Sequence, residues 1–212
     1  MIRIDLHVHT HHSRDCRMTP QEIIATVQQR GLGGVAITDH NAIAGALELA
    51  AVAPFPVIVG EEIKTTEGEI IGLFLTEQIA RGLSPAETIA AIRAQGGLVY
   101  VPHPLDSVRR SPLKRAALDA IVDEIDVLEV FNARVLLPWD NRRAREFALA
   151  HGIPAGGGSD AHIPAEIGAA YVEMPPFSGR DDFMRQIVHG QVRGRLSPPW
   201  VHWFSTLNKH RK

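Results

Sequence analysis

The sequence predicts an α/β fold in which a mostly parallel sheet is covered by helices. Apolar runs of strand length recur along the chain, and most are followed by a segment with helical periodicity. The apolar runs are nearly continuous, as in strands that are buried on both faces. Seven or so βα units of this kind would form either a barrel or an open sheet, and 212 residues are few for a closed eight-unit barrel.

Each element follows from its local pattern. We expect strands at residues 2–8, 33–39, 55–63, 69–75, 97–103, 126–132, 153–159 and 169–174. We expect helices at residues 20–31, 42–52, 85–97, 111–124, 141–152 and 179–190. Two helices should begin at a capping hydroxyl followed by proline and two should end at glycine: Thr19–Pro20, Ser84–Pro85, Gly31 and Gly152.

Composition and charge narrow the class of protein. Hydrophobic residues make up 45% and charged residues 22%, which are ordinary globular values. A net charge of -2 provides no broad positive field for non-specific nucleic-acid binding, so we expect a small substrate. The single cysteine, Cys16, excludes an intrachain disulfide and a thiolate metal site. Without a signal-like start or a long apolar run, we expect a cytoplasmic protein with no membrane contact and no obligate protein partner.

The last segment differs in character from the rest of the chain. We expect a catalytic domain at 1–196 and a tail at 197–212. Trp200, Trp203 and Phe204 give this tail aromatic bulk before a basic end. We expect the aromatic side chains to pack on the domain, and a partner or membrane contact is the alternative.

Residues that can bind metals stand at the carboxyl ends of the predicted strands. His7 and His9 end the first strand, and the two-residue period of a strand places both imidazoles on one side. Later strands lead into further imidazoles and carboxylates: Asp39, His40, Glu61, Glu62, His103, Asp160 and His162. Active sites of barrels are built at this end of the strands. The pattern therefore predicts a metal site with nitrogen and oxygen ligands.

These residues belong to motifs that resemble those of the PHP (polymerase and histidinol phosphatase) family. The motifs HVHTHHSRD, TDHN, GEEI, VPHP and GGGSDAH occur in the family's order, and the resemblance covers about residues 1–175. It implies a distorted TIM-like (βα)7 barrel with the metal site at the strand carboxyl ends. It also implies two or three divalent ions (zinc, manganese or iron) and hydrolysis of phosphoesters.

The resemblance implies a ligand set residue by residue. His7 and His9 would hold one metal with Glu62 and Asp160, and Glu62 would bridge to a second metal bound by His103. Asp15, His40 and His162 would hold a third metal. Glu61 is expected to point away from the site, because neighbouring residues of a strand alternate in direction. Asp39 is expected to orient the adjoining loop or a histidine.

Two positions depart from the family's pattern. The acidic residue of the first loop is Asp15, one place later than in many relatives, with His11 and His12 as rival ligands. Where relatives often have a histidine, this chain has Glu69, which we expect to bind metal, since a carboxylate suits the same ions. The alternative is that Glu69 is a solvated turn residue and the second metal is missing or loosely held.

The predicted function is hydrolysis of a small phosphomonoester, a nucleotide or a short oligonucleotide by a metal-activated hydroxide. Arg134 is the first choice to bind the phosphate and Arg109 the second, with Asn132 holding substrate or loop. Arg14 and Arg110 are further candidates. The alternatives are hydrolysis of a non-phosphate bond and a metal-binding regulatory module without catalysis.

Overall fold

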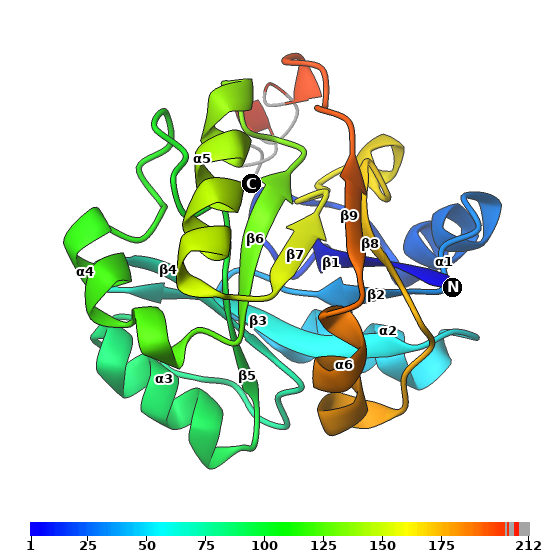
Figure 1. Cartoon of the computed structure of the whole chain (residues 1–212). Helices are drawn as coiled ribbons and strands as arrows, with labels where there is room; N and C mark the ends of the chain where they lie inside the picture. Colours follow the sequence, from blue (N-terminus) through cyan, green and yellow to red (C-terminus); the bar gives the residue numbers. More distant parts are fainter. Residues whose placement is uncertain (202, 204–205, 208–212) are drawn as a thin grey trace.

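The structure is a computed structural model that describes residues 1–201, 203, 206 and 207. Within these residues, nine strands form one sheet in the order β7-β6-β5-β4-β3-β2-β1-β8-β9 (Figure 1). The strands are β1 (Ile2–Val8), β2 (Gly34–Ile37), β3 (Val57–Thr65), β4 (Gly68–Leu73), β5 (Leu98–Val101), β6 (Val127–Asn132), β7 (Ala155–Gly158), β8 (Ala170–Met174) and β9 (Gln191–Gly194).

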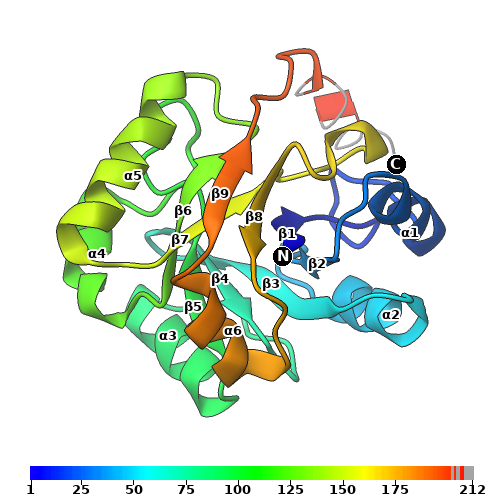
Figure 2. The same ribbon diagram turned by 45° about the vertical axis from the view of Figure 1, so that its right-hand side comes forward.

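The helices lie around the outside of this sheet (Figures 1 and 2). They are α1 (Pro20–Gln29), α2 (Ala44–Val52), α3 (Pro85–Ala94), α4 (Arg115–Ala120), α5 (Pro138–His151) and α6 (Gly179–Ile187). Two short 3-10 helices, η1 (Val122–Glu124) and η2 (Pro164–Glu166), complete the described elements. None of the helices in this part of the chain is both long and apolar enough to cross a bilayer.

The sheet curls into a distorted barrel. Beyond β7, the Asp160 N–H donates to the carbonyl of His7 at 2.7 Å, and the His9 N–H donates to the carbonyl of Ala161 at 3.0 Å. These bonds join the first strand of the sheet order, β7, to β1, which is the seventh. The predicted barrel is therefore confirmed, with the carboxyl ends of β1 and β7 side by side.

The strand directions differ from the expected mostly parallel sheet. The pairs β1–β2, β2–β3, β5–β6 and β6–β7 are parallel, whereas β3–β4, β4–β5, β1–β8 and β8–β9 are antiparallel. The β3–β4 pair is a hairpin that turns between Thr65 and Gly68, which needs no crossover helix. The expectation of a mostly parallel sheet was wrong, because the apolar pattern of two consecutive strands does not show whether they run parallel or antiparallel.

The predicted helix ends are mostly confirmed. Helices α1 and α3 each begin with a complete capping box, Thr19 with Glu22 and Ser84 with Glu87. Gly152 ends α5 in the left-handed conformation. The predicted helix 111–124 is shorter, because the Lys114 N–H donates to the carbonyl of Glu67 and ties residues before α4 to the hairpin turn.

Apolar side chains between sheet and helices form the core. Val8 and Ile37 pack with Ile23 and Val27 of α1, while Val99 and Val101 pack with Ile89 and Ile92 of α3. In the C-terminal segment Val201 is buried, whereas Trp200 and Trp203 are 51% and 66% exposed. Phe204 and the basic end at 209–212 lie outside the described residues, so the packing of the tail stays a prediction.

Candidate metal centre

The two histidines that end β1 face each other. The Nε2 atoms of His7 and His9 are 3.1 Å apart, and both side chains are fully buried. Nδ1 of His7 lies 3.1 Å from a carboxylate oxygen of Glu129, which can only accept, so this nitrogen carries the proton. Nδ1 of His9 lies 3.1 Å from the hydroxyl of Ser13, which itself donates to Asp39 at 2.6 Å.

In both rings Nδ1 faces an oxygen, so the two Nε2 atoms point toward one another in the buried interior. Burial opposes a positive charge here, but Asp160, Glu129 and Glu62 raise the pKa of His7 well above its ordinary value, so the carboxylates favour a cation at this place. A metal ion bound by both Nε2 atoms would supply that positive charge. The residues at this place therefore fit a metal ion.

Two carboxylates complete the group around the histidine pair. Oδ1 of Asp160 lies 3.3 Å from Nε2 of His9 and 3.8 Å from Nε2 of His7. Glu62 lies 3.7 Å from Nε2 of both histidines. Burial opposes ionisation of Asp160, but Arg109 and the adjacent histidines hold the pKa of this carboxyl well below its usual range.

Glu62 stands between two further imidazoles. Its Oε2 lies 2.7 Å from Nδ1 of His40, and its Oε1 lies 3.2 Å from Nε2 of His103. A carboxylate with one oxygen toward each side is suited to bridge two metals, as expected. The neighbouring Glu61 points away and accepts the Ile79 N–H at 2.8 Å, as strand alternation requires.

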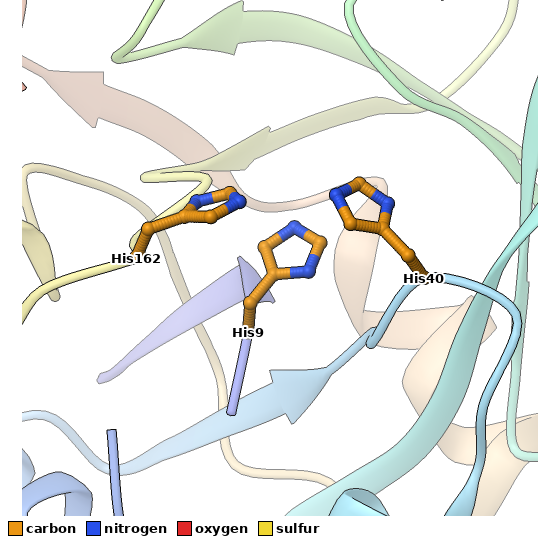
Figure 3. Close-up of side chains that lie close together, drawn as sticks. All are labelled: His9, His40 and His162. Atoms are coloured by element: carbon orange, nitrogen blue, oxygen red, sulfur yellow. The ribbon is translucent and has the colours of Figure 1, made fainter. Parts of the chain in front are cut away.

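A third group lies on the other side of His9. Figure 3 shows the imidazoles of His9, His40 and His162 turned toward a common space. The ring centroid of His9 lies 4.5 Å from that of His40 and 4.3 Å from that of His162. Oδ1 of Asp15 lies 3.5 Å from Nε2 of His40 and 3.4 Å from Nε2 of His162. The chain thus brings the three predicted ligands of the third metal together.

Glu69 lies at the edge of the cluster. Its Oε2 is 3.9 Å from Nε2 of His103, and it can join His40 and Glu62 in one ligand group. Glu69 belongs to β4, where it pairs with Lys64, and it is buried rather than solvated in a turn. Burial and the negative charge of Glu62 raise the pKa of Glu69. A cation beside Glu69 would lower this pKa again.

Two of the clustered residues have unusual backbone conformations. His103 and Asp160 have φ values of 30° and 55°, which non-glycine residues rarely adopt. The surrounding contacts hold them there: the His103 N–H donates to Glu129 at 2.7 Å and the Asp160 N–H to His7. Strain of this kind gathers at functional sites.

Sequence reasoning missed Glu129, the main residue behind the cluster. Its carboxylate lies 3.1 Å from Nδ1 of His7 and accepts from the hydroxyl of Tyr100 at 3.0 Å and from the amide of Asn132 at 2.9 Å, besides the His103 N–H. A carboxylate behind a metal-binding histidine fixes its tautomer and raises its basicity. The feature that could have revealed it is a glutamate in the middle of an otherwise apolar strand, VLEVFN.

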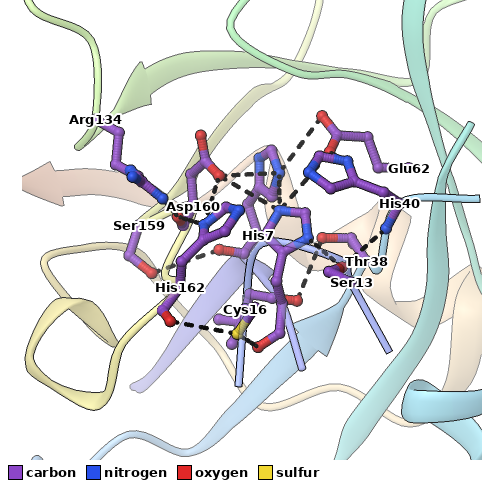
Figure 4. A network of polar contacts seen from close by, with 12 residues as sticks. His7, Ser13, Cys16, Thr38, His40, Glu62, Arg134, Ser159, Asp160 and His162 are labelled. Atoms are coloured by element: carbon purple, nitrogen blue, oxygen red, sulfur yellow. Dashed lines mark hydrogen bonds and ion pairs between the residues drawn. The ribbon is translucent and has the colours of Figure 1, made fainter. Parts of the chain in front are cut away.

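Other buried polar residues shape the loops that carry the ligands. Asp39 accepts from the N–H and hydroxyl of Thr10 and from Ser13, so it orients the first loop, as expected. Asp5, also missed, accepts from the N–H and hydroxyl of Ser159. Burial raises the pKa of Asp5 to about 6. Figure 4 shows the polar contacts around His7, Asp160 and His162.

Gly158 allows the close approach that the cluster needs. A Cβ at this position would lie 2.3 Å from Cβ of His7 and 2.7 Å from Oε1 of Glu129. Only glycine fits between them. Cys16 is buried close by, and its thiol donates to the carbonyls of His9 and His162.

The cluster opens into a cavity of about 560 Å³. Four arginines line it: Arg14, Arg109, Arg110 and Arg134. Arg109 binds Asp160 at 2.5 Å and Asp106 at 3.2 Å, and Arg134 lies 3.4 Å from Glu166. Asn132 is fully buried and donates to Glu129 and Asp160, so it is suited to position these carboxylates, and its contact with substrate stays a prediction.

The rival ligands of the first loop lie elsewhere. His11 and His12 turn to Glu48 of α2, at 3.7 Å and 3.1 Å. They form an exposed group that is separate from the buried ones. Asp15 is therefore the residue of this loop that the structure brings to the cluster.

Comparisons with known proteins agree with this geometry. The PHP domain model matches residues 5–92, and a PHP-associated model matches residues 138–192. An uncharacterised protein of Methanocaldococcus jannaschii is 44% identical over 146 residues, which cover 62% of this chain and 82% of that protein. A 3′,5′-nucleoside bisphosphate phosphatase of Chromobacterium violaceum is 32% identical over 123 residues, 55% of this chain and 36% of that enzyme.

A solved structure shows the same fold. It is a candidate metal-dependent phosphoesterase from Bifidobacterium adolescentis, with a TM-score of 0.63 and 22% identity over 76% of this chain and 88% of that chain. The two matched segments contain the predicted ligands of the first strands and of the GGGSDAH motif. The chain belongs to the PHP family.

Proposed function

We propose that the protein is a metal-dependent phosphoesterase that hydrolyses a small phosphomonoester, a nucleotide or a short oligonucleotide. The observation that carries this proposal is the buried cluster of imidazoles and carboxylates at the floor of a cavity lined by arginines. A ligand cluster alone would suit many hydrolytic reactions. Guanidinium groups beside it favour an anionic substrate, because arginine binds phosphate oxygens in a bidentate manner.

The residues divide among two or three divalent metals. His7, His9, Asp160 and Glu62 would hold one, and Glu62, His103 and Glu69 a second, with His40 beside them. Asp15, His40 and His162 would hold the third. Bound metals supply a water of lowered pKa and draw charge from phosphoryl oxygens. Imidazole and carboxylate ligands suit zinc, manganese and iron.

The arginines would orient the phosphate. Arg134 is 4% exposed and held by Glu166, and its Nη1 donates to the Asp160 carbonyl at 3.3 Å, so its guanidinium is fixed beside the cluster. Arg109 neutralises the outer oxygen of Asp160, which reduces the negative charge that a phosphate would meet. Arg14 and Arg110 also line the cavity and are suited to bind the rest of an anionic substrate.

The related phosphatase supports phosphate as the reacting group. The similar enzyme of Chromobacterium violaceum acts on 3′,5′-nucleoside bisphosphates, although this chain covers only 36% of it. A nucleotide would bind in the same arrangement, with one phosphate at the metals and the rest of the molecule against the arginines. We therefore place nucleoside phosphates first among the substrates to be tried.

Phosphate release from a panel of esters tests the proposal. The panel includes a chromogenic monoester, nucleoside monophosphates and bisphosphates and a short oligonucleotide, each with Mn²⁺, Zn²⁺ or Fe²⁺. We expect His9→Ala and Asp160→Ala to abolish release while thermal unfolding stays cooperative. His151→Ala and Asp123→Ala, at exposed positions, are matched controls that should retain it.

Each other outcome has a clear meaning. If no ester in the panel releases phosphate while an amide or another bond is cleaved, the enzyme acts on a non-phosphate bond. If His9→Ala and Asp160→Ala match the wild-type protein in every assay, the cluster is not catalytic. The protein would then be a metal-binding module.

A further inference from the structure

Two histidines of the first loop form a group of their own with a glutamate of α2. Nε2 of His11 lies 3.7 Å and Nε2 of His12 3.1 Å from the same oxygen of Glu48, and the two rings are 4.4 Å apart between centroids. One ligand atom from each of the three residues lies within 4.8 Å of the others. We propose that His11, His12 and Glu48 form a separate surface site for a divalent transition metal.

Hydrogen bonds orient the ring of His11 toward this site. Its Nδ1 lies 3.3 Å from the carbonyl of Met18, which can only accept. This nitrogen therefore carries the proton, and in the neutral ring the lone pair is on Nε2, which faces Glu48. The His11 N–H also donates to the Met18 carbonyl, at 2.9 Å, so backbone and ring are held together. Metal-binding histidines are commonly oriented in this way.

The ring of His12 is held against α2. Its backbone N–H donates to the hydroxyl of Thr10 at 3.1 Å, and its imidazole lies over Gly45. A Cβ on Gly45 would lie 2.2 Å from both Oδ2 of Asp39 and Oγ1 of Thr10, and 3.1 Å from Cδ2 of His12. Gly45 precedes Glu48 by three residues on the same side of the helix. The missing side chain thus leaves room for the contact between Asp39 and Thr10 that holds the loop, and also for the edge of the His12 imidazole beside the carboxylate.

The ligands indicate which metals the site would take. Two imidazole nitrogens and one carboxylate oxygen match sites of zinc, cobalt and nickel that keep a further position for water. Water can reach this site, since the three side chains are 40%, 33% and 47% exposed. An exposed site with three protein ligands should bind more weakly than the buried cluster.

A metal here would act on the loop that serves the buried cluster. The same loop carries Ser13, which contacts His9 and Asp39, and Asp15, which faces His40 and His162. A metal shared by the loop and α2 would tie the two together. The surface site would thereby stabilise the side of the cluster to which Asp15 belongs.

Cobalt titration of the full chain tests the proposal, with calorimetry and the visible absorption of bound Co²⁺ as readouts. The wild-type protein should bind one more equivalent than Glu48→Gln, and the double variant His11→Gln/His12→Gln should lose the same equivalent. His189→Ala, at an exposed histidine far along the chain, should bind as the wild type does. Cooperative thermal unfolding without metal shows that each variant folds.

The cobalt titration tests the surface site independently of the proposed enzymatic function. In an Asp160→Ala background, which weakens the buried cluster, the more weakly bound equivalent of cobalt should remain and should still depend on Glu48. If the wild type and Glu48→Gln bind equal numbers of cobalt ions, the three residues form only an exposed ion pair. That outcome overturns the proposal whether or not the protein hydrolyses phosphate esters.

Discussion

Oε1 of Glu129 lies 3.1 Å from Nδ1 of His7, on the side of the imidazole that faces away from the proposed metals. The carboxylate accepts from His7, Tyr100, Asn132 and the His103 backbone. All four partners are donors. Glu129 therefore fixes a ligand from each of two strand ends, His7 at the end of β1 and His103 just after β5.

Glu129→Gln should weaken metal binding by about 10–100-fold. A glutamine brings an NH₂ group to a place where only donors surround it, so at least one donor loses its acceptor. Metal retention against a chelator, followed by elemental analysis, measures the effect. Glu173→Gln, at a half-buried position in β8 beside Arg3, is the control that should leave retention unchanged. Equal retention by Glu129→Gln and wild type would show that the carboxylate does not support His7.

Glu69→Ala should lower the bound metal by one equivalent, or loosen that equivalent so that dialysis removes it. Its carboxylate would complete the ligand group of Glu62 and His103. Metal stoichiometry by elemental analysis measures the change, with Glu77→Ala on the exposed loop after β4 as control. An unchanged stoichiometry would reject Glu69 as a ligand.

Gly158→Ala should destabilise the fold by about 1–3 kcal/mol, since the new Cβ overlaps His7 and Glu129. It should also reduce the bound metal, because the backbone must move away from His7. Gly96→Ala is a useful comparison, since nothing lies near its added Cβ and only the positive φ opposes it. Denaturant unfolding and metal content measure the two effects, and full metal content in Gly158→Ala would contradict the close packing.

The pKa of Glu87 should respond to Ser84. The hydroxyl of Ser84 donates to the Glu87 carboxylate at 2.6 Å and the Ser84 N–H at 2.8 Å, which lowers the pKa of Glu87. Because the folded pKa is the lower one, this interaction stabilises the fold above the unfolded pKa and is lost as the pH falls through the folded value.

NMR titration of Glu87 measures this dependence. We expect Ser84→Ala to raise the pKa of Glu87 toward its ordinary value and to flatten the acid side of the stability curve. A pKa of Glu87 that stays the same in Ser84→Ala would exclude the hydroxyl as the cause.

The sequence predicted the parts of the site that depend on local pattern. Strand ends are marked by apolar runs that lead into His7, His40, Glu62 and His103, and a barrel brings such ends together. The helix starts at Pro20 and Pro85 were likewise clear from their capping residues. Periodicity and caps are properties of neighbouring residues, so they can be seen without a structure.

Contacts between distant strands were harder to foresee. Glu129 and Asp5 each stand out in the sequence as a charged residue inside a mostly apolar strand. The strand's own sequence does not show which residues contact that charge. Strand β9 is short and mostly exposed, so it has no apolar pattern. The direction of β4 depends on a two-residue turn, and His12 meets Glu48, which lies 36 residues later in the chain.

Anomalous scattering from crystals grown with Mn²⁺ or Zn²⁺ tests the central claim most directly. We predict element-specific peaks within about 2.0–2.2 Å of Nε2 of His7 and His9 and of the Glu62 carboxylate. Inorganic phosphate soaked into the same crystals should lie between these peaks and Arg134. Crystals that hydrolyse a phosphate ester but show no peak at His7, His9 or Glu62 would contradict the account.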